Sequence, residues 1–592
     1  MCGIAGLMMR DGSAPDRALL DRMIGAIAHR GPDGDGLHIA RSVGLAQVRL
    51  AIIDLETGDQ PIHEPGGAVI VANGEIYNYI ELKQTLTDIS FSSESDCEPP
   101  LHLYRKNGVR FADALRGMYA LAIHDMAQDC LILSRDPFGI KPLYYCETNE
   151  FLAFASEPQA LLAAGVAPRA EDPRRRDELL QLQFNCGHET IFRNIQRVLP
   201  GETLLIRAGR VVERHRIEML PTERPDPLPN LSVSDALLQL DRTLETSVRL
   251  HQRSDVPYGM FLSGGIDSSA ILALMARLNA NPVHAFTIGF SKTAVHDERD
   301  HAKAVAKAVG AEHHEIEFDE ADFWTHLPEV ASCMDDPTAD YAVLPTWKLA
   351  REAAHELKVI LCGEGGDELF AGYGRYRSQL RPWWQGGRTM RARGIFDGLG
   401  VLRNEPQGWR DGIDSAQTTA TLPHRSRLQI AQATDCADWL PNDLLTKLDR
   451  CLMAHGLEGR TPFLDREVAK IAFNLPDDMK IKKGLGKWLL RQWLEQVLPA
   501  ARPFERKRGF TVPVGEWIQR RGDTLGPLVA AQPAIAELCH PERVKRIFCS
   551  TKKRAGNAAW ILLFYALWHR CHIENEPNDG DVFAVLSQST SR

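Results

Sequence analysis

The chain has 592 residues, of which 44% are hydrophobic and 25% charged, and its formal net charge is −9. This length exceeds a single hydrophobic core, so we expect several globular domains. The acidic balance and the scattered arginines disfavour DNA or RNA as the main partner. No apolar run reaches the roughly 18 residues of a membrane span, and no secretory signal opens the chain, so we expect a cytoplasmic protein without membrane contact.

Residues 1–200 contain short β-rich runs separated by Gly, Asp and Asn turns. The runs lie at 43–54, 67–79, 119–136 and 151–156, and the segment 16–30 has the apolar spacing of a helix. This pattern predicts stacked antiparallel sheets with helices on their outer faces.

Four prolines within 217–230 indicate a linker, and the pattern changes after it. Apolar strands at 256–263, 283–290, 312–318 and 358–366 alternate with helical stretches such as 268–279 and 299–310. This alternation predicts right-handed βαβ units and a doubly wound parallel sheet. Helical patterns dominate from about residue 390, and "AAWILLFYALW" at 558–568 is interpreted as a buried helix. We therefore expect domains over 1–210 and 232–580, a linker over 211–231 and a tail over 581–592.

The 12 cysteines include no CxxC pair and no regular spacing. In a chain this long, that pattern argues against a disulfide framework and a zinc site, and it favours a reducing compartment. Cys2 has three interpretations: a buried small side chain, a lipidated residue, or a nucleophile freed by removal of Met1. No apolar stretch precedes Cys2, which excludes lipidation and leaves packing and catalysis open.

The loop "SGGIDSS" (263–269) lies between a predicted strand and a predicted helix. Two glycines permit close backbone approach, three serines offer hydroxyls, and the N–H groups that open a helix attract an anion. The loop therefore predicts a phosphate cradle, although a serine-capped turn is the alternative for any short Gly/Ser/Asp cluster. The GxxxxGK[ST] pattern of a Walker A loop is absent, which disfavours γ-phosphate hydrolysis.

A second glycine loop, "CGEGGDELFAGY" (362–373), follows a later strand of the same predicted sheet. Ligands of open α/β sheets bind at the carboxyl ends of strands, so both loops should open on one crevice. Glu364 and Asp367 could hold magnesium or act as bases, because hard oxygen ligands suit that ion. The alternative is that these carboxylates only solvate the loop.

Four amino-terminal motifs resemble, in this order, the class II glutamine amidotransferases, which have an N-terminal-nucleophile fold. They are "MCGIAG" (1–6), "HRGPDGDG" (29–36), "VANGEIYNY" (71–79) and "SESDCE" (93–98). The loop at 263–269 resembles the SGGxDS loop of the ATP pyrophosphatases. Together with "GEGGDELFAGY", "EGRTPFLD" (458–465), "GKWLLR" (486–491) and "KRGFTVPVGEWI" (507–518), the motifs resemble the bacterial type of glutamine-hydrolysing asparagine synthetase. The resemblance implies an αββα glutaminase sandwich followed by a parallel-sheet synthetase domain.

For the glutaminase domain, the resemblance implies that Cys2 becomes a thioester-forming nucleophile once Met1 is removed. A terminal amine has a pKa of about 7.7–8.0, so the freed amine of Cys2 is a usable base beside its own thiol. In the implied glutamine site, Arg49 binds the α-carboxylate. Asn73 and the backbone of Gly74 form the oxyanion hole, and Glu75 and Asp96 bind the α-amino group.

For the synthetase domain, the resemblance implies ATP and Mg²⁺, with an acyl-adenylate as intermediate. Glu364 would deprotonate incoming ammonia, and Lys487 would stabilise the developing charge and pyrophosphate; a solvated helix lysine is the alternative for Lys487. Asp267 and Asp367 would hold the metal. The implied ATP-binding residues are Phe261, Ser263, Gly264, Gly265, Asp267, Ser268, Ser269, Ile288, Cys362 and Gly363.

Two features depart from the family pattern. Cys362 stands where several relatives have serine, which weakens the case for a hydroxyl contact to ATP there. "DCEPPL" has two prolines where relatives continue with apolar residues. Proline is tolerated in the first turn of a helix, so we expect a helix to begin at this point.

The expected activity is ATP-dependent synthesis of asparagine from aspartate, with glutamine as nitrogen donor and ammonia passing between the domains. The substrates would be glutamine, aspartate and ATP, and the family implies a homodimer. One alternative is amidation of another carboxylate in a polysaccharide, peptide or secondary metabolite. A second is a silent nucleotide- or glutamine-sensing protein, and a third, tRNA modification, is disfavoured by the net acidity.

Overall fold

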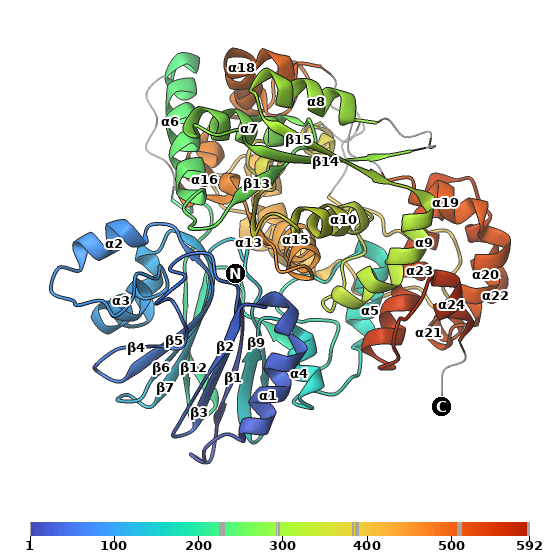
Figure 1. Cartoon of the computed structure of the whole chain (residues 1–592). Helices are drawn as coiled ribbons and strands as arrows, with labels where there is room; N and C mark the ends of the chain where they lie inside the picture. Colours follow the sequence, from blue (N-terminus) through green and yellow to red (C-terminus); the bar gives the residue numbers. More distant parts are fainter. Residues whose placement is uncertain are drawn as a thin grey trace.

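The computed structural model describes residues 2–223, 231–291, 293, 297–381, 384, 390–505 and 512–588. Residues 224–230 of the predicted linker and 507–511 of the motif at 507–518 therefore lie outside the described residues. Figure 1 shows a sandwich of two sheets in the amino-terminal part, a third sheet beside it, and the carboxyl-terminal helices packed at one end of that third sheet. Among the described residues, every helix is too short or too polar to cross a bilayer.

Two six-stranded antiparallel sheets face each other in the amino-terminal part (Figure 1). The first sheet has the order β10 (Gln196–Arg197), β8 (Tyr144–Glu147), β9 (Phe151–Ala155), β1 (Cys2–Met9), β3 (Val43–Arg49), β2 (Gly34–Ala40). The second has the order β12 (Arg210–Arg216), β11 (Glu202–Arg207), β7 (Cys130–Arg135), β6 (Gly117–Asp125), β5 (Ala68–Ile76), β4 (Ile62–His63). Strand β12 thus runs into the segment 211–231.

Helices cover both outer faces of this sandwich. Helices α1 (Arg17–Ala26) and α4 (Pro158–Ala163) pack on the first sheet, while α3 (Pro99–Asn107) packs on the second, with α2 (Tyr79–Thr85) beside it. The predicted αββα sandwich is confirmed. Both prolines of "DCEPPL" lie in the first turn of α3, where their missing N–H groups interrupt no helical hydrogen bond, which confirms the helix predicted there.

The third sheet is parallel throughout, with the order β15 (Glu312–Phe318), β14 (His284–Phe290), β13 (Tyr258–Phe261), β16 (Val359–Leu361), β17 (Glu458–Arg460). The chain moves outward from β13 in one direction and returns to β16 on its other side, so the sheet is doubly wound as predicted. Helices α8 (Arg299–Ala308) and α10 (Val343–Ala353) pack on β14 and β15. The strand order reverses between β13 and β16, where such sheets bind ligands.

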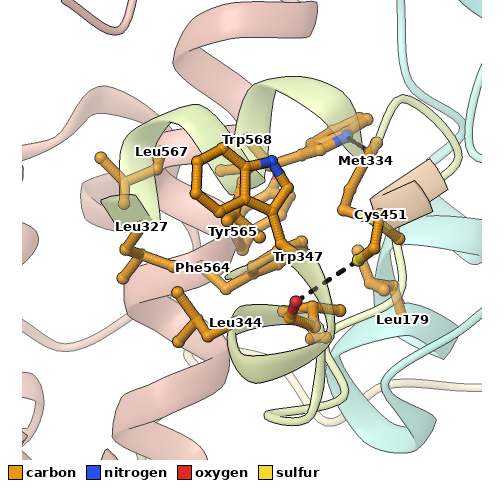
Figure 2. Packing of buried hydrophobic residues seen from close by; sticks show 14 of the residues in the cluster. Leu179, Leu327, Met334, Leu344, Trp347, Cys451, Phe564, Tyr565, Leu567 and Trp568 are labelled. Carbon is orange, nitrogen blue, oxygen red and sulfur yellow. Dashed lines mark hydrogen bonds between the residues drawn. The ribbon is translucent and has the colours of Figure 1, made fainter. Parts of the chain in front are cut away.

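The carboxyl-terminal helices form a large apolar core against α9 (Glu320–Cys333) and α10. Figure 2 shows its centre, where Trp347 and Trp568 pack among leucines and the Trp568 indole donates to the Met334 carbonyl at 3.0 Å. The predicted buried helix at 558–568 lies within α23 (Lys553–His572). A last helix, α24 (Val582–Ser587), lies within the segment 581–592 and packs on α9.

Buried ion pairs join the sandwich to the region around the third sheet. The fully buried guanidinium of Arg30 donates to Glu157 at 2.6 Å and, across the contact, to Asp449 at 2.8 Å. Arg116 binds both carboxylate oxygens of Asp465 at 2.6 and 2.8 Å. A buried charge is costly once a partner is lost, so these pairs hold the two parts in one relative position.

Candidate active sites

Cys2 opens β1 at the edge of the sandwich that faces the third sheet (Figure 1). Its side chain is 7% exposed, and its backbone nitrogen donates to Asn73 Oδ1 at 3.3 Å. Arg30 Nε donates to the Cys2 carbonyl at 3.3 Å, which links the residue to the ion pair with Asp449. Burial raises the pKa of the thiol, so a base beside it is needed to form the thiolate.

Asn73 and Gly74 lie next to each other on β5. The carboxamide nitrogen of Asn73 donates to Ser156 Oγ at 3.4 Å, a long bond that an incoming oxygen can replace. Gly74 has φ +156°, and a Cβ there would lie 2.1 Å from the Met118 carbonyl oxygen. Only glycine fits this position, so the backbone beside Asn73 is held by the sheet itself.

Glu75 and Asp96 are almost fully buried, at 3% and 4% exposure. The Ile76 N–H donates to Asp96 at 2.7 Å, while Arg460 Nη2 lies 3.4 Å from Glu75 Oε2. Burial raises the pKa of both carboxyls, that of Asp96 to about 6, and Arg460 opposes the rise. The two buried carboxyls form an acidic pair that Arg460 only partly compensates, an environment that suits an α-ammonium ligand.

Arg460 is a site residue that sequence reasoning missed. It belongs to β17, and its Nε also donates to Glu458 at 2.6 Å, so it connects the pocket of the sandwich to the third sheet. The motif "EGRTPFLD" contains it, and this was the available signal, although the motif by itself indicates no role.

Arg49 pairs with Cys2 in register across β1 and β3. Its guanidinium donates to Asp59 at 2.6 Å and to the Asp54 carbonyl at 2.5 Å. The Asp59 side chain is 85% exposed, so a ligand carboxylate can compete with it for the guanidinium. The structure thus places Cys2 and Arg49 on neighbouring strands of the first sheet and Asn73 on β5 of the facing sheet, in contact with Cys2.

The two glycine loops meet where the strand order reverses. Gly265 caps α7 (Ile266–Leu278), and Ser263 Oγ lies 3.1 Å from Ser268 Oγ. A Cβ on Gly363 would lie 3.1 Å from Asp267 Cβ and 3.2 Å from the Ser268 nitrogen. The two loops are therefore in contact, as expected for loops at the carboxyl ends of neighbouring strands, and the crevice between them stays a prediction.

The other predicted nucleotide residues surround this contact. Phe261 ends β13, Ser269 is fully buried in α7, and Ile288 lies in β14 with 5% exposure. Gly264 adopts φ +71°, a left-handed conformation that glycine tolerates. Cys362 is 1% exposed and belongs to the apolar core, so its thiol is packed like a small hydrophobic side chain.

Lys487 joins the two loops electrostatically. Its side chain is 1% exposed, its ammonium contacts the Asp267 carboxylate, and it lies 2.7 Å from Asp367 Oδ1. Its backbone has φ +56°, which costs a non-glycine residue on the order of 1–3 kcal/mol and is typical of functional positions. The interpretation as a solvated helix lysine does not fit this burial.

The same carboxylates suit magnesium. Asp267 Oδ1 is buried without a hydrogen-bond partner among the described residues, and Asp367 converges on the same ammonium. A Cβ on Gly366 would come within 2.4 Å of Asp267 Oδ1, so glycine leaves room beside that oxygen. Hard carboxylate oxygens at the end of a phosphate cradle are the donors that Mg²⁺ takes.

Glu364 lies on the second loop, and burial raises the pKa of its carboxyl while the ammonium of Lys447 lowers it. Lys447 Nζ binds Asp340 Oδ2 at 2.8 Å. A carboxylate with a raised pKa is a stronger base than a solvated one. Sequence reasoning missed Lys447 and Asp340, which lie outside every motif.

The asparagine synthase family model matches residues 239–570, and the glutamine amidotransferase domain model matches residues 1–216. The Bacillus subtilis protein named asparagine synthetase (glutamine-hydrolyzing) 1 is 32% identical, over 97% of this chain and 97% of its own. The B. subtilis protein named asparagine synthetase (glutamine-hydrolyzing) 2 is 30% identical, over 84% of this chain and 70% of its own. "Amidase chyE" of Penicillium rubens is 32% identical over 81% of this chain and 83% of its own. A solved B. subtilis glutamine phosphoribosylpyrophosphate amidotransferase is 16% identical, covers 53% of this chain and 81% of its own, and has a TM-score of 0.28, too low to add to the assignment. The chain belongs to the asparagine synthase family and carries the glutamine amidotransferase domain at its amino terminus.

Proposed function

We propose that this enzyme transfers the amide nitrogen of glutamine to L-aspartate activated by ATP, yielding asparagine, glutamate, AMP and pyrophosphate. The observation that carries the proposal is that Lys487, Asp267 and Asp367 meet where both glycine loops converge, in a chain whose Cys2 opens a second, polar site. The family resemblance further supports a cytoplasmic homodimer.

In the glutaminase site, the sulfur of Cys2 attacks the carboxamide carbon of glutamine. The α-amine freed by loss of Met1 accepts the thiol proton and returns it to the departing ammonia. The fraction of this amine that is neutral at pH 7 can take the proton. Asn73 and the Gly74 N–H donate to the oxyanion, and each such donor is worth about 3–4 kcal/mol. Water then hydrolyses the thioester to glutamate, and Glu75 and Asp96 hold the α-ammonium throughout.

In the synthetase site, a carboxylate oxygen of aspartate attacks the α-phosphorus of ATP, and pyrophosphate leaves. Asp267 and Asp367 would hold a magnesium ion, which would neutralise charge on the phosphates. Lys487 stabilises the charge that develops on the leaving oxygens. Ammonia attacks the β-aspartyl-AMP carbonyl, Glu364 accepts a proton from the attacking nitrogen, and AMP leaves.

The acceptor is tested by ATP–pyrophosphate exchange with a panel of carboxylic acids. Exchange isolates the activation step, so it needs neither glutamine nor ammonia. We expect L-aspartate to stimulate exchange at least tenfold over L-glutamate, whose extra methylene costs about 1–3 kcal/mol in a fitted site. Stimulation by another carboxylate and not by aspartate would contradict the acceptor assignment and support the alternative.

That alternative, amidation of another carboxylate, is favoured by one observation. The relatives at about 32% identity include proteins named amidases as well as asparagine synthetases. The same residues would perform the same steps on a different acid, so the exchange panel separates the two candidates directly.

The use of glutamine should depend on the charge of Asp96. Its folded pKa is raised to about 6, so the carboxylate that attracts the α-ammonium is present above pH 6 and is lost as the pH falls through 6. We expect the KM for glutamine to rise about tenfold between pH 7 and pH 5, measured by glutamate release. In Asp96→Asn the KM should already be high at pH 7, because the carboxylate of Asp96 is absent at every pH. A KM that stays constant in the wild type over this range would contradict the assignment.

A further inference from the structure

A group of histidine and glutamate side chains lies at the far end of the third sheet from the glycine loops. His284 and His314 are on β14 and β15, whose register pairs His284 with Glu312 and Phe286 with His314. Residues two apart on a strand share a face, so both histidines and Glu312 lie on one face of the sheet. His284 is the first residue of β14, whereas the nucleotide loop follows the carboxyl end of β13.

One distance in this group matches an edge of a metal coordination tetrahedron, and two others, to the two oxygens of Glu312, are slightly longer. His284 Nδ1 lies 3.3 Å from His314 Nε2. Carboxylate oxygens of Glu312 lie 3.6 Å from His284 Nδ1 and 3.7 Å from His314 Nε2. A tetrahedral zinc ion with Zn–N bonds of about 2.0–2.1 Å separates its ligand atoms by about 3.3–3.4 Å. Closing the group around an ion therefore needs only small side-chain movements.

A fourth ligand comes from a third segment of the chain. One ligand atom each of His284, His314 and Glu356 lies within 4.8 Å of the other two. Glu356 belongs to the connection between α10 and β16, and α10 packs on β14 and β15. The side chains of His284 and His314 are 35% and 26% exposed, so an ion can enter from solvent.

The surroundings orient one ligand and supply charge. The His314 ring stacks on Phe286, with centroids 4.5 Å apart and an interplanar angle of 11°, which limits its rotation. Two carboxylates beside two neutral imidazoles offset the charge of a divalent cation. Without an ion, the two ring nitrogens share one hydrogen bond, which is the competing explanation for their contact.

We propose that His284, His314, Glu312 and Glu356 bind one Zn²⁺ ion. Mixed imidazole and carboxylate ligands suit zinc, and four protein ligands would close the coordination sphere, as in structural sites. The ion would join the amino ends of β14 and β15 to the segment that enters β16, and β16 leads into the loop at 362–367. The site is separate from the ATP crevice and does not rest on the proposed function. Cysteine spacing did not indicate it, because its ligands are histidines and glutamates from three segments.

The test compares zinc retained by full-length proteins after chelator treatment, reloading with ZnCl₂ and desalting. The variants are the double substitution His284→Gln/His314→Gln and, as a matched control, His424→Gln, an exposed histidine elsewhere. We expect the wild type and the control to retain one more equivalent of zinc per chain than the double variant. Zinc bound by Cys2 or by the carboxylates of the proposed ATP site is present in all three proteins, so it cancels in the difference between the wild type and the double variant.

Two further measurements separate a site from loss of structure. Zinc should raise the Tm of the wild type and the control but not that of the double variant, with far-UV circular dichroism reporting the fold of each. Should the double variant unfold, Glu356→Gln changes an exposed ligand alone and should weaken zinc binding at least about tenfold. Equal zinc content in the wild type and a folded double variant, or unchanged affinity in Glu356→Gln, would overturn the proposal.

Discussion

Cys2→Ala is expected to abolish glutamine-dependent synthesis, by on the order of 10⁴-fold or more, while synthesis from ammonia stays within about twofold of the wild type. The reason is that, in the proposed mechanism, the sulfur forms the covalent intermediate, whereas the proposed ATP-binding residues do not depend on it. Product formation is measured with glutamine and with ammonium chloride as separate nitrogen donors. Persistence of both activities would exclude the thioester at Cys2.

The matched control for this experiment is Cys146→Ala. Cys146 is a buried thiol on β8 in the same sheet, with 1% exposure, so its removal has a similar packing cost without touching the glutamine site. Both activities should survive in the control. Intact mass gives a companion test: if the α-amine of Cys2 is the base, as proposed, the active wild-type protein lacks Met1.

Lys487→Met should produce the reciprocal pattern. We expect synthesis from either nitrogen donor and ATP–pyrophosphate exchange to fall by at least about 10³-fold, while hydrolysis of glutamine to glutamate continues. The ammonium is buried between Asp267 and Asp367, and without it the charge that develops on the phosphates loses the cation that contacts both carboxylates. Methionine retains most of the side-chain volume of lysine, so the loss of activity reports the removal of the positive charge.

Lys483→Met serves as the control for Lys487. Lys483 is exposed and has φ +52°, close to the +56° of Lys487, so the substitution places the same side chain on the same type of backbone. Its activities should remain within about twofold of the wild type. If Lys487→Met also behaves in this way, Lys487 has no part in the chemistry and the charge of the crevice must be met by another group.

Local patterns predicted most of the fold. The short β-rich runs separated by Gly, Asp and Asn turns before residue 200 predicted the antiparallel sandwich, and alternating strands and helices predicted the doubly wound sheet. The prolines at 99 and 100 predicted the start of α3. These features follow from side chains close together in sequence, since the strand and helix periods and the missing proline N–H act within a few residues. The domain boundaries stay a prediction.

Parts of the candidate sites were also accessible from the sequence. Loops that follow parallel strands emerge at one edge of the sheet, so the contact of Gly363 with Asp267 followed from topology. Cys2, Asn73 and Lys487 were predicted from motifs; the structure places Cys2 beside Asn73 and Lys487 beside Asp367, and their catalytic roles stay predictions.

Only the tertiary structure showed the partners that come from distant segments. Arg460 reaches Glu75 across 385 positions of the chain, counting from 75 to 460, and Arg30 finds Asp449 in the same way. Neither pair has a local signal, because a buried charge takes its partner from whichever segment packs against it. The pairing of His284 with His314 likewise depends on the register of β14 and β15. By itself, therefore, the sequence determined the layers and the doubly wound parallel sheet, and it supplied the candidates for the reactive groups. Packing decided which charged side chains face the candidate reactive groups, since their pairing depends on contacts between segments hundreds of residues apart.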